Sequence, residues 1–491
     1  MMNSRQTYNF NSDLMMEWIK AISEIGPRRA GSPANHQTED FIMELLKGFG
    51  VDNVHKEPIQ VEYWYVEKSS FEINDGSGFS PVDAQWIPYC AFTPAVGIEG
   101  ELVYADPKKL FQAKNWKGKV VLTDISYPEL DVKLLSKFSL GQYDPNNNMQ
   151  DIRHPATWVR INWHFYREAI RKQAVGFIGI LKDQPGGSYR MYAPYGFKEK
   201  NILDKPLTGF WISRNNGPKL RELAKRGGTI ARMVLTGDKT PSITHNIVGE
   251  IPGKSDEIVI LHCHHDSPFT SPVEDASGCS VILALAKYFA EKKNAQRKIL
   301  VLLTAGHFYG SIGTKRYILN HQEDILPNVS LEISVEHIAK EAVENQNGEL
   351  YYSGQPEGTG AFIPFNSRMR DLVLSAIEQN YLDRVFLLPP EGPLGDYPPT
   401  DGGDWYEAGF PLINFISNPV YLLNAEDNLE WVMKERLPKI AAAVADIVVG
   451  ADKFNKDEIR QVEFRSLKRK MKLIKHLVRM KTSRFGTRPV Y

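Results

Sequence analysis

The stretch that decides the fold is a short apolar run ending in polar residues: Ile258-Val259-Ile260-Leu261-His262-Cys263-His264-His265-Asp266-Ser267. Its first half has the length and the continuous apolar character of a strand buried on both faces, which is typical of parallel sheets. In such sheets ligands bind outside the carboxyl ends of the strands. The sequence therefore predicts a buried strand over residues 258–263 with a functional site at its end.

Strands and helices alternate along the chain on the C-terminal side of residue 245. The predicted strands cover residues 258–263, 298–304, 331–335 and 412–416, and the predicted helices cover residues 278–291, 312–321, 367–379 and 428–449. Such alternation is typical of a mostly parallel sheet with helices on both faces. We therefore expect the α/β fold class, with a catalytic α/β domain over residues 245–450.

The remaining chain divides into three further segments. Residues 1–66 contain two predicted helices between residues 12 and 49 and an alternating strand over 51–66, and we expect them to join the α/β domain. Residues 80–240 carry short apolar runs separated by Gly, Pro and Asn, which predicts an inserted β-rich domain with its own small core.

The segment 452–491 is strongly basic, and Leu467, Met471, Ile474 and Leu477 follow a helical spacing within it. This pattern predicts an amphipathic tail helix that packs on the body of the molecule or on a second subunit. A homo-oligomer is therefore left open. A site for an anionic surface is the alternative interpretation of the same pattern.

Composition excludes several classes of function. The 491 residues include 59 basic and 59 acidic side chains, so charge does not indicate a nucleic-acid partner. We find no secretory signal and no apolar run of about 18 residues, so no membrane span is expected. Cys90, Cys263 and Cys279 are an odd count in a long chain and are predicted to be reduced and buried, which favours a cytoplasmic location.

Polar clusters follow three predicted strands. Besides His264-His265-Asp266, the strand over 298–304 leads to His307, and the strand over 331–335 leads to Glu336-His337. Glu274-Asp275 lies on the loop before the first helix of the α/β domain. Imidazoles and carboxylates that converge on one crevice are what a divalent metal ion requires. We therefore expect these clusters to form one metal site.

Four motifs in order resemble the di-zinc aminopeptidase superfamily, which includes bacterial leucyl aminopeptidases, glutamate carboxypeptidase and the glutaminyl cyclases. They are the strand with His264-His265-Asp266-Ser267, the segment Glu274-Asp275-Ala276-Ser277-Gly278, the segment Thr304-Ala305-Gly306-His307-Phe308-Tyr309-Gly310, and the pair Thr400-Asp401 with Gly409-Phe410-Pro411. The resemblance implies a zinc aminopeptidase-like fold, and it implies that the insert over 80–240 is similar to a protease-associated domain.

The same resemblance identifies candidate ligands and important departures. It places His264, Glu274 and Glu336 at the positions that hold one metal ion. Phe308 and Leu423 stand where the family has ligands of the other ion, and neither can bind a metal. We therefore expect one divalent ion per chain: zinc on the family resemblance, iron(II) on the altered ligand set, with manganese also compatible.

Other residues of the site have predicted supporting roles. His307 replaces the family's general-base Glu and is expected to be the base or a further ligand, and Asp266 is expected to orient His264 by accepting its other ring N–H. Asp275 and His337 are possible additional ligands. The candidate substrate contacts are Asp401, Tyr406 and Tyr421, although capping of the following helix would also explain Asp401.

Three functions are compatible with these residues. The first is a mononuclear metal-dependent hydrolase that cleaves an amide or related C–N bond in a small molecule or short peptide-like substrate. The second is a metal enzyme that is not a hydrolase, with iron as a candidate metal. The third is a pseudoenzyme that binds a ligand or partner without turnover.

Overall fold

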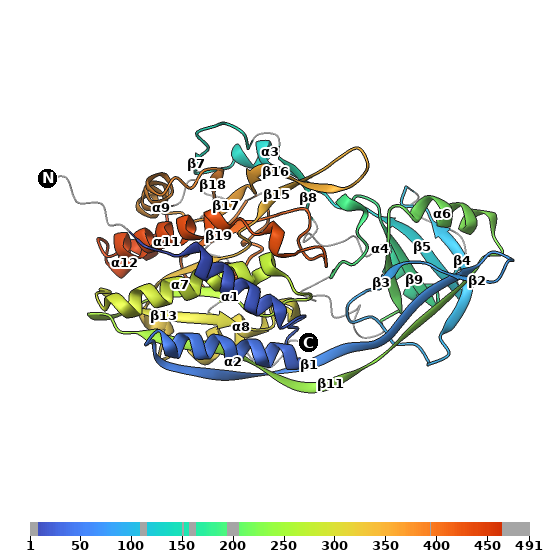
Figure 1. Cartoon of the computed structure of the whole chain (residues 1–491), viewed down its shortest axis with the longest axis horizontal. Helices are drawn as coiled ribbons and strands as arrows, with labels where there is room; N and C mark the ends of the chain where they lie inside the picture. Colours follow the sequence, from blue (N-terminus) through green and yellow to red (C-terminus); the bar gives the residue numbers. More distant parts are fainter. Residues whose placement is uncertain are drawn as a thin grey trace.

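A computed structural model describes residues 8–108, 115–149, 152–156, 164–193, 206–392 and 394–463. Figure 1 shows a large body on the left, with layers of helices and strands, and a smaller lobe on the right. A long two-stranded ribbon runs along the lower edge of the molecule and joins the two. The predicted tail helix at Leu467–Leu477 lies outside the described residues.

The body is built on parallel strands in the order β13 (Arg297–Thr304), β12 (Ser255–His264), β14 (Val329–Val335) and β19 (Leu412–Ser417). Beyond β19 lie β17 (Thr359–Phe362), which is antiparallel to it, and β18 (Val385–Leu388). A separate hairpin consists of β15 (Lys340–Glu344) and β16 (Leu350–Pro356). The carboxyl ends of β12, β13 and β14 therefore meet at one edge, as the sequence predicts.

Successive side chains of β12 point to opposite faces of the sheet, and helices cover both faces. Val259, Leu261 and Cys263 pack in one apolar cluster with helices α1 (Ser12–Glu24), α2 (Pro33–Gly48), α7 (Ser277–Lys292), α9 (Ser367–Gln379) and α11 (Leu437–Ala451). Ile258 and Ile260 pack on the other face with α8 (Ile312–Asn320) and α10 (Gly402–Glu407). The predicted α/β class with helices on both faces is confirmed.

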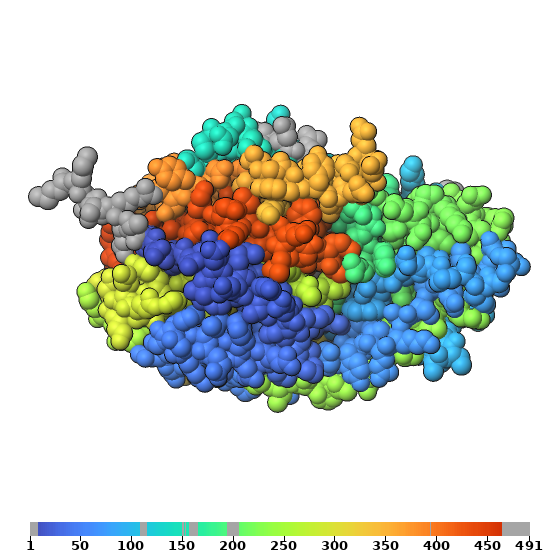
Figure 2. All heavy atoms as spheres, in the orientation of Figure 1, coloured from blue at the N-terminus to red at the C-terminus, as the bar shows by residue number. Residues whose placement is uncertain are grey.

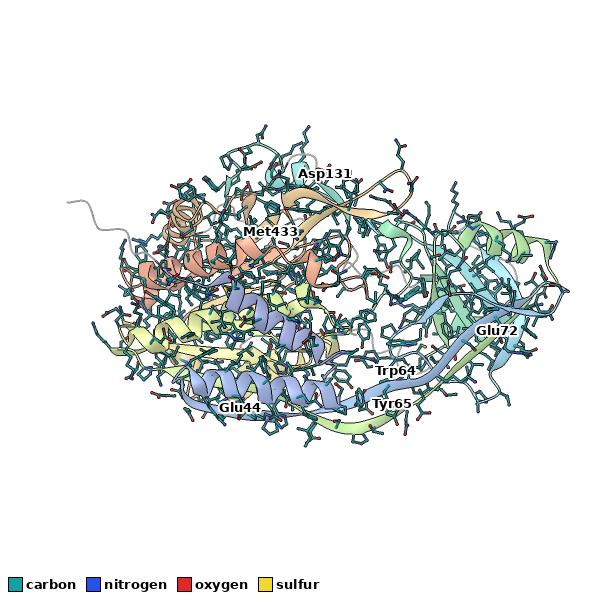
Figure 3. The ribbon with its side chains drawn as sticks, viewed as in Figure 1. Glu44, Trp64, Tyr65, Glu72, Asp131 and Met433 are labelled. Carbon is teal, nitrogen blue, oxygen red and sulfur yellow. The ribbon has the colours of Figure 1, made fainter. Side chains whose placement is uncertain are left out.

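The ribbon between the body and the lobe consists of β1 (Asp52–Asn74) and β11 (Ile230–Ile251), which pair in antiparallel fashion along almost their whole length. In Figure 3, Trp64 and Tyr65 lie midway along β1, Glu72 lies at the lobe end, and Glu44 of α2 lies beneath the body. The Trp64 ring stacks on Phe92 with centroids 5.2 Å apart, so the ribbon is packed against the lobe at its midpoint.

The lobe has its own sheet, in which β4 (Ile98–Ala105), β5 (Lys119–Ile125), β9 (Gly176–Leu181) and β10 (Gly209–Ser213) are parallel neighbours. Short strands β2 (Phe79–Pro81) and β3 (Ala84–Trp86) complete it, and α4 (His164–Arg171) and α6 (Gly217–Arg226) are its helices. The lobe is therefore a mixed α/β unit and not one made of strands alone.

One excursion from the lobe sequence returns to the body. It contains β6 (Glu129–Asp131), α3 (Val132–Ser136), β7 (Gly141–Tyr143) and β8 (Arg153–Pro155). Strand β7 pairs with β18 of the body, and β6 pairs with β8. The teal atoms of this excursion lie against the orange atoms of the body at the top of Figure 2, and Asp131 is labelled there in Figure 3.

The helix predicted over residues 428–449 begins later than expected. Residues Leu429–Trp431 and Lys434–Arg436 form single 3₁₀ turns, and α11 starts at Leu437, with Pro438 in its first turn. Proline lacks an N–H and fits only the first turn of a helix, so the helix cannot run through it from residue 428. The last helix of the described chain is α12 (Lys456–Arg460). In the ranges that the structure describes, every helix is too short or too polar to cross a membrane.

Candidate metal centre

Three buried side chains converge where β12 and β14 end. His264 is the last residue of β12, Glu274 lies in the turn Pro272–Ala276 before α7, and His337 follows β14 by two residues. His264 Nε2 lies 3.1 Å from Glu274 Oε1, and His337 Nε2 contacts Glu274 Oε2. One ligand atom from each residue lies within 4.8 Å of the other two, which is close enough for a single ion.

The outer ring nitrogens determine which way the two imidazoles present their lone pairs. His264 Nδ1 lies 2.9 Å from the backbone carbonyl of Asp266, and His337 Nδ1 lies 2.9 Å from the backbone carbonyl of Ser417. A carbonyl only accepts, so each Nδ1 donates its hydrogen, and each Nε2 is the ring atom that faces Glu274 and that would bind a metal ion once it carries no proton.

The chemistry of this group fits a zinc ion. Within the described residues, His264 Nε2, His337 Nε2 and Glu274 Oε2 are buried and have no hydrogen-bond partner outside this group. Three buried donor atoms that contact only one another can all turn to a bound ion without giving up another partner. Two neutral imidazoles and one carboxylate are a common zinc donor set that leaves a position open for substrate or water.

The charges in the group are mutually supporting. Burial disfavours ionised Glu274, but the His337 and His264 imidazoles hold the pKa of that carboxyl well below its usual range. Burial disfavours the imidazolium of His337, but Glu274 raises the pKa of His337 to about 9. Glu274 is therefore a carboxylate at neutral pH, which is the form that binds a metal ion.

The backbone before α7 is held by groups that the sequence did not single out as site residues. Asp427 accepts hydrogen bonds from the N–H groups of Val273 (3.1 Å) and Glu274 (3.0 Å). The buried Arg28 guanidinium donates to the carbonyls of His265, Thr270 and Ser271 at 3.0, 2.6 and 3.0 Å. These contacts link residues far apart in the sequence, so no local pattern indicates them.

His337 reaches Glu274 because the chain turns sharply after β14. Its φ of 57° lies in the left-handed region, which is uncommon for a residue with a side chain. Asp275 Oδ1 accepts the N–H of His337 at 3.1 Å and that of Gly278 at 3.2 Å. A side chain at Gly278 would collide with this carboxylate and with the Val335 carbonyl. The sequence names Asp275 as a possible ligand, but its carboxylate fixes the backbone at His337 and Gly278. Asp275 is in none of the described groups of possible metal ligands.

His307 forms a second group with Asp401 beside the first. Its Nδ1 lies 2.8 Å from Asp401 Oδ1, and its ring stacks on that of His264 with centroids 4.1 Å apart. Burial disfavours the charged ring, but Asp401 raises the pKa of His307 to about 10. Asp401 makes no side-chain cap for α10, so its carboxylate serves His307 and not the helix.

Asp266 and Glu336 occupy different positions from those expected. His264 Nδ1 binds the main-chain carbonyl of Asp266, whereas the Asp266 carboxylate accepts the backbone N–H of His307 at 3.1 Å. Glu336 Oε1 accepts from the Asp401 N–H at 3.1 Å and from Asn414 Nδ2 at 2.9 Å. Glu336 is in none of the three described donor groups, so the geometry favours His337 over Glu336 as the third ligand.

The two candidate tyrosines lie away from these groups. The Tyr406 hydroxyl donates to Glu391 at 2.9 Å, and the buried Tyr421 hydroxyl donates to the Lys340 carbonyl at 2.8 Å. Neither lines the pocket that opens onto the metal ligands. Their contacts are those of structural residues, and the structure gives no support for a substrate role.

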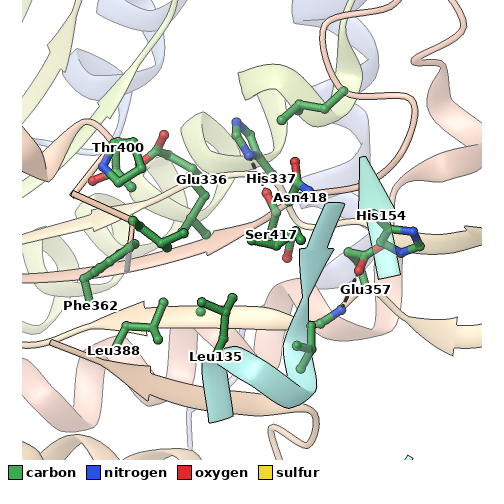
Figure 4. Close-up of a pocket in the computed structure, with 18 of the residues that line it drawn as sticks. Leu135, His154, Glu336, His337, Glu357, Phe362, Leu388, Thr400, Ser417 and Asn418 are labelled. Atoms are coloured by element: carbon green, nitrogen blue, oxygen red, sulfur yellow. Dashed lines mark hydrogen bonds and ion pairs between the residues drawn. The ribbon is translucent and has the colours of Figure 1, made fainter. Parts of the chain in front are cut away.

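That pocket has a volume of about 780 Å³, and its lining includes Glu274, His307, Glu336 and His337. Figure 4 shows Glu336 and His337 on one side and the apolar side chains of Leu135, Phe362 and Leu388 below them. Leu423 also lines the pocket, while Phe308 packs against the Tyr192 ring with centroids 5.6 Å apart. Both positions that the sequence resemblance assigns to a second metal ion are thus occupied by packed apolar side chains.

Comparisons with known proteins agree with this fold. Residues 246–448 match the model of peptidase family M28. Bovine carboxypeptidase Q is 20% identical over 313 residues, which cover 61% of this chain and 60% of that protein. The chain therefore matches only three fifths of the length of this relative.

Solved structures extend the likeness to nearly the whole chain. A peptidase M28 precursor from Shewanella amazonensis has a TM-score of 0.64 at 18% identity, covering 93% of this chain and 99% of that one. A zinc aminopeptidase from Bacillus subtilis has a TM-score of 0.62 at 18% identity, with coverage of 94% and 100%. An aminopeptidase from an Aneurinibacillus species has a TM-score of 0.60 at 20% identity, with coverage of 90% and 94%. The aminopeptidase-like fold that the sequence resemblance implies is confirmed.

Proposed function

We propose that this protein is a zinc-dependent hydrolase that cleaves an amide bond in a small or short peptide-like substrate. His264, Glu274 and His337 would hold the ion. The observation that carries the proposal is the convergence, beside an apolar pocket, of three buried donor atoms that contact only one another. The match of residues 246–448 to a peptidase family supports the reaction class.

The residues around the ion have separate tasks. A bound zinc ion supplies Lewis acidity, which polarises a carbonyl and lowers the pKa of a bound water. His307 lines the pocket and is held by Asp401 through Nδ1, so its Nε2 is the atom that would exchange a proton with substrate. The apolar walls exclude water and so strengthen electrostatic interactions at the reacting bond.

We propose one ion per chain. The adjacent donor group, His264 with His307 and Asp401, shares its first ligand with the zinc group, so these two do not make two independent sites. A third described group, His36 with Glu39 and His245, has the Lys56 ammonium 3.2 Å from its carboxylate, which disfavours a cation there. Phe308 and Leu423 offer no donor atom. Zinc is favoured over iron(II) and manganese because solved zinc aminopeptidases share this fold and because the ligands are two imidazoles and one carboxylate.

Metal analysis of the purified full chain, prepared in air and anaerobically, tests this proposal. We expect one zinc per chain, and we expect His264→Ala and His337→Ala to lose it. Glu336→Gln is the matched control and should retain zinc, because its carboxylate binds Asp401 and Asn414. Two ions per chain would overturn the single-ion proposal. The absence of metal from every preparation would overturn the proposal that this protein is a zinc-dependent hydrolase.

The reaction class has its own test. Turnover of an amide substrate in oxygen-18 water should place the label in the product carboxylate, because hydrolysis takes its oxygen from water. Product that forms without label would instead support a metal enzyme that is not a hydrolase.

A further inference from the structure

A second polar group lies at the other end of the same pocket. His154 of β8 and Glu357, in the turn between β16 and β17, are both buried and both line the pocket. His154 Nε2 lies 3.2 Å from Glu357 Oε2 as an ion pair. In Figure 4, Asn418 lies between this pair and His337, and a dashed line joins His154 to Glu357.

The amide atoms of Asn418 beside this pair are not engaged in hydrogen bonds. In the ranges that the structure describes, both are buried without a hydrogen-bond partner, and His154 Nε2 and Glu357 Oε2 have no partner besides each other. Glu357 Oε1, by contrast, accepts the N–H of Gly358 at 2.9 Å. Leaving a buried polar atom unsatisfied costs about 1–3 kcal/mol, so an unsatisfied buried amide beside an ion pair in a cavity indicates a polar ligand group.

The charges behind the pair are already compensated. Arg384 pairs with Glu341 at 3.0 Å, and Arg436 pairs with Asp383 at 3.3 Å. Burial disfavours the imidazolium of His154, but the Glu357 carboxylate raises the pKa of that ring. The ion pair of His154 with Glu357 carries no net charge, so this part of the pocket offers a donor and acceptors without a net charge.

The middle of the pocket is apolar. Leu135 and Ile152 come from the excursion, and Phe362, Phe386 and Leu388 come from β17 and β18. These side chains line the same cavity as His337 and the His154–Glu357 pair. A ligand that fills it needs an apolar part against these walls and a polar group that meets the pair.

We propose that His154, Glu357 and Asn418 bind an uncharged hydroxyl or carboxamide at the end of the substrate remote from the scissile bond. This inference rests on the proposed function, because the zinc centre fixes the other end of the substrate. A neutral group that both donates and accepts satisfies Glu357 Oε2 and His154 Nε2 together. A substrate with an ammonium or carboxylate there would carry an unbalanced charge into a buried site.

Alkanehydroxamates test the proposal without turnover, because the hydroxamate head binds zinc and the tail enters the pocket. Dissociation constants are measured by calorimetry on the zinc-loaded full chain for tails of four to ten carbons ending in methyl, hydroxyl, ammonium or carboxylate. At one tail length we expect the hydroxyl compound to bind about tenfold more tightly than the methyl compound and more tightly than both charged compounds.

The double variant His154→Leu/Glu357→Leu should abolish the preference for hydroxyl over methyl. Both partners become apolar together, so no single charge is left buried and unpaired. Leu388→Ile is the matched control in the apolar wall and should weaken both compounds alike, leaving their ratio unchanged.

Each other outcome decides between the two proposals. Binding of every tail without a hydroxyl preference at any length would overturn this inference and leave the zinc centre in place. A preference for the ammonium or carboxylate tail would overturn its claim of neutrality. Failure of all hydroxamates to bind would overturn the zinc centre and with it the placement of the substrate.

Discussion

At the scale of single residues, His307 and Asp401 are placed together by two separate parts of the fold. His307 follows β13, whereas Asp401 precedes α10, and they meet at 2.8 Å. The His307 ring lies flat on His264, so its position is fixed from two sides. A carboxylate on Nδ1 also fixes the tautomer, which determines the ring nitrogen that faces the substrate.

Asp401→Asn should lower kcat by about 100-fold, because general acid–base catalysis contributes at least that much in enzymes. The zinc content should remain unchanged, because Asp401 is not a ligand in the proposed group. Steady-state kinetics on an amide substrate and metal analysis of the same sample check both results. Asp404→Asn is the matched control on α10, because Asp404 faces Lys315 at 3.7 Å, and its kcat should stay near wild type. Loss of zinc together with activity would contradict the role given to Asp401.

The sequence predicted most of the residues that meet at the site, but not their contacts. His264 and Glu274 could be predicted because they follow a buried strand in a recognisable motif. The sequence names Glu336 as a ligand and His337 only as a possible further one, because alternation of side chains stops where β14 ends at Val335 and no longer shows where each points. The left-handed turn at His337 brings its ring against Glu274.

At the scale of elements, the turn before α7 carries Glu274 and is held by the N-terminal segment of the chain. Arg28, between α1 and α2, reaches four carbonyls of residues 265–274, the last of them Glu274 at 3.4 Å. A guanidinium has five donors in a planar fork, and no other side chain can satisfy these carbonyls together.

Arg28→Met should lower the free energy of unfolding by about 3 kcal/mol, because it leaves several buried carbonyls without a donor. Urea denaturation should show a lower midpoint with an unchanged slope. Arg29→Met is the control, because Arg29 is only half-buried and lies over the Trp86 ring at 5.2 Å. Equal losses in the two variants would show that Arg28 has no special role.

Elements with long periodic patterns were predicted well, and short non-local ones were missed. The helix predicted over 367–379 coincides with α9, and the strand predicted over 298–304 lies within β13. The three-residue strands of the excursion gave no pattern, because their pairing with β18 and with each other depends on contacts far away in the sequence.

At the scale of the whole molecule, the lobe and the body share one apolar cluster. Phe308, Leu422 and Leu423 of the body belong to the same buried cluster as the strands of the lobe. The ribbon of β1 and β11 adds backbone pairing along the same path. We therefore expect the two units to unfold together.

Removal of zinc by a chelator should lower the midpoint of the single thermal transition, and added zinc should restore it. A ligand present at a thousand times its dissociation constant stabilises the folded state by about 4 kcal/mol, and that contribution disappears with the ligand. Differential scanning calorimetry measures the shift, and His337→Ala should show none. An unchanged midpoint in the wild-type chain, or a shift confined to one of two transitions, would contradict this account.

The excursion from the lobe brings residues from an early part of the chain to the pocket in the body, which bears on how substrate selectivity can evolve. The proposed zinc donors lie within residues 264–337, whereas His154 and Leu135 of the pocket come from a stretch more than 100 residues earlier in the chain and Glu357 comes from a later one. The two proposals thus assign reactivity and selectivity to separate parts of the chain. Mutations in the earlier stretch can therefore change which substrates the pocket binds without altering the proposed zinc donors. That separation allows related proteins to acquire different substrates while they keep one reaction.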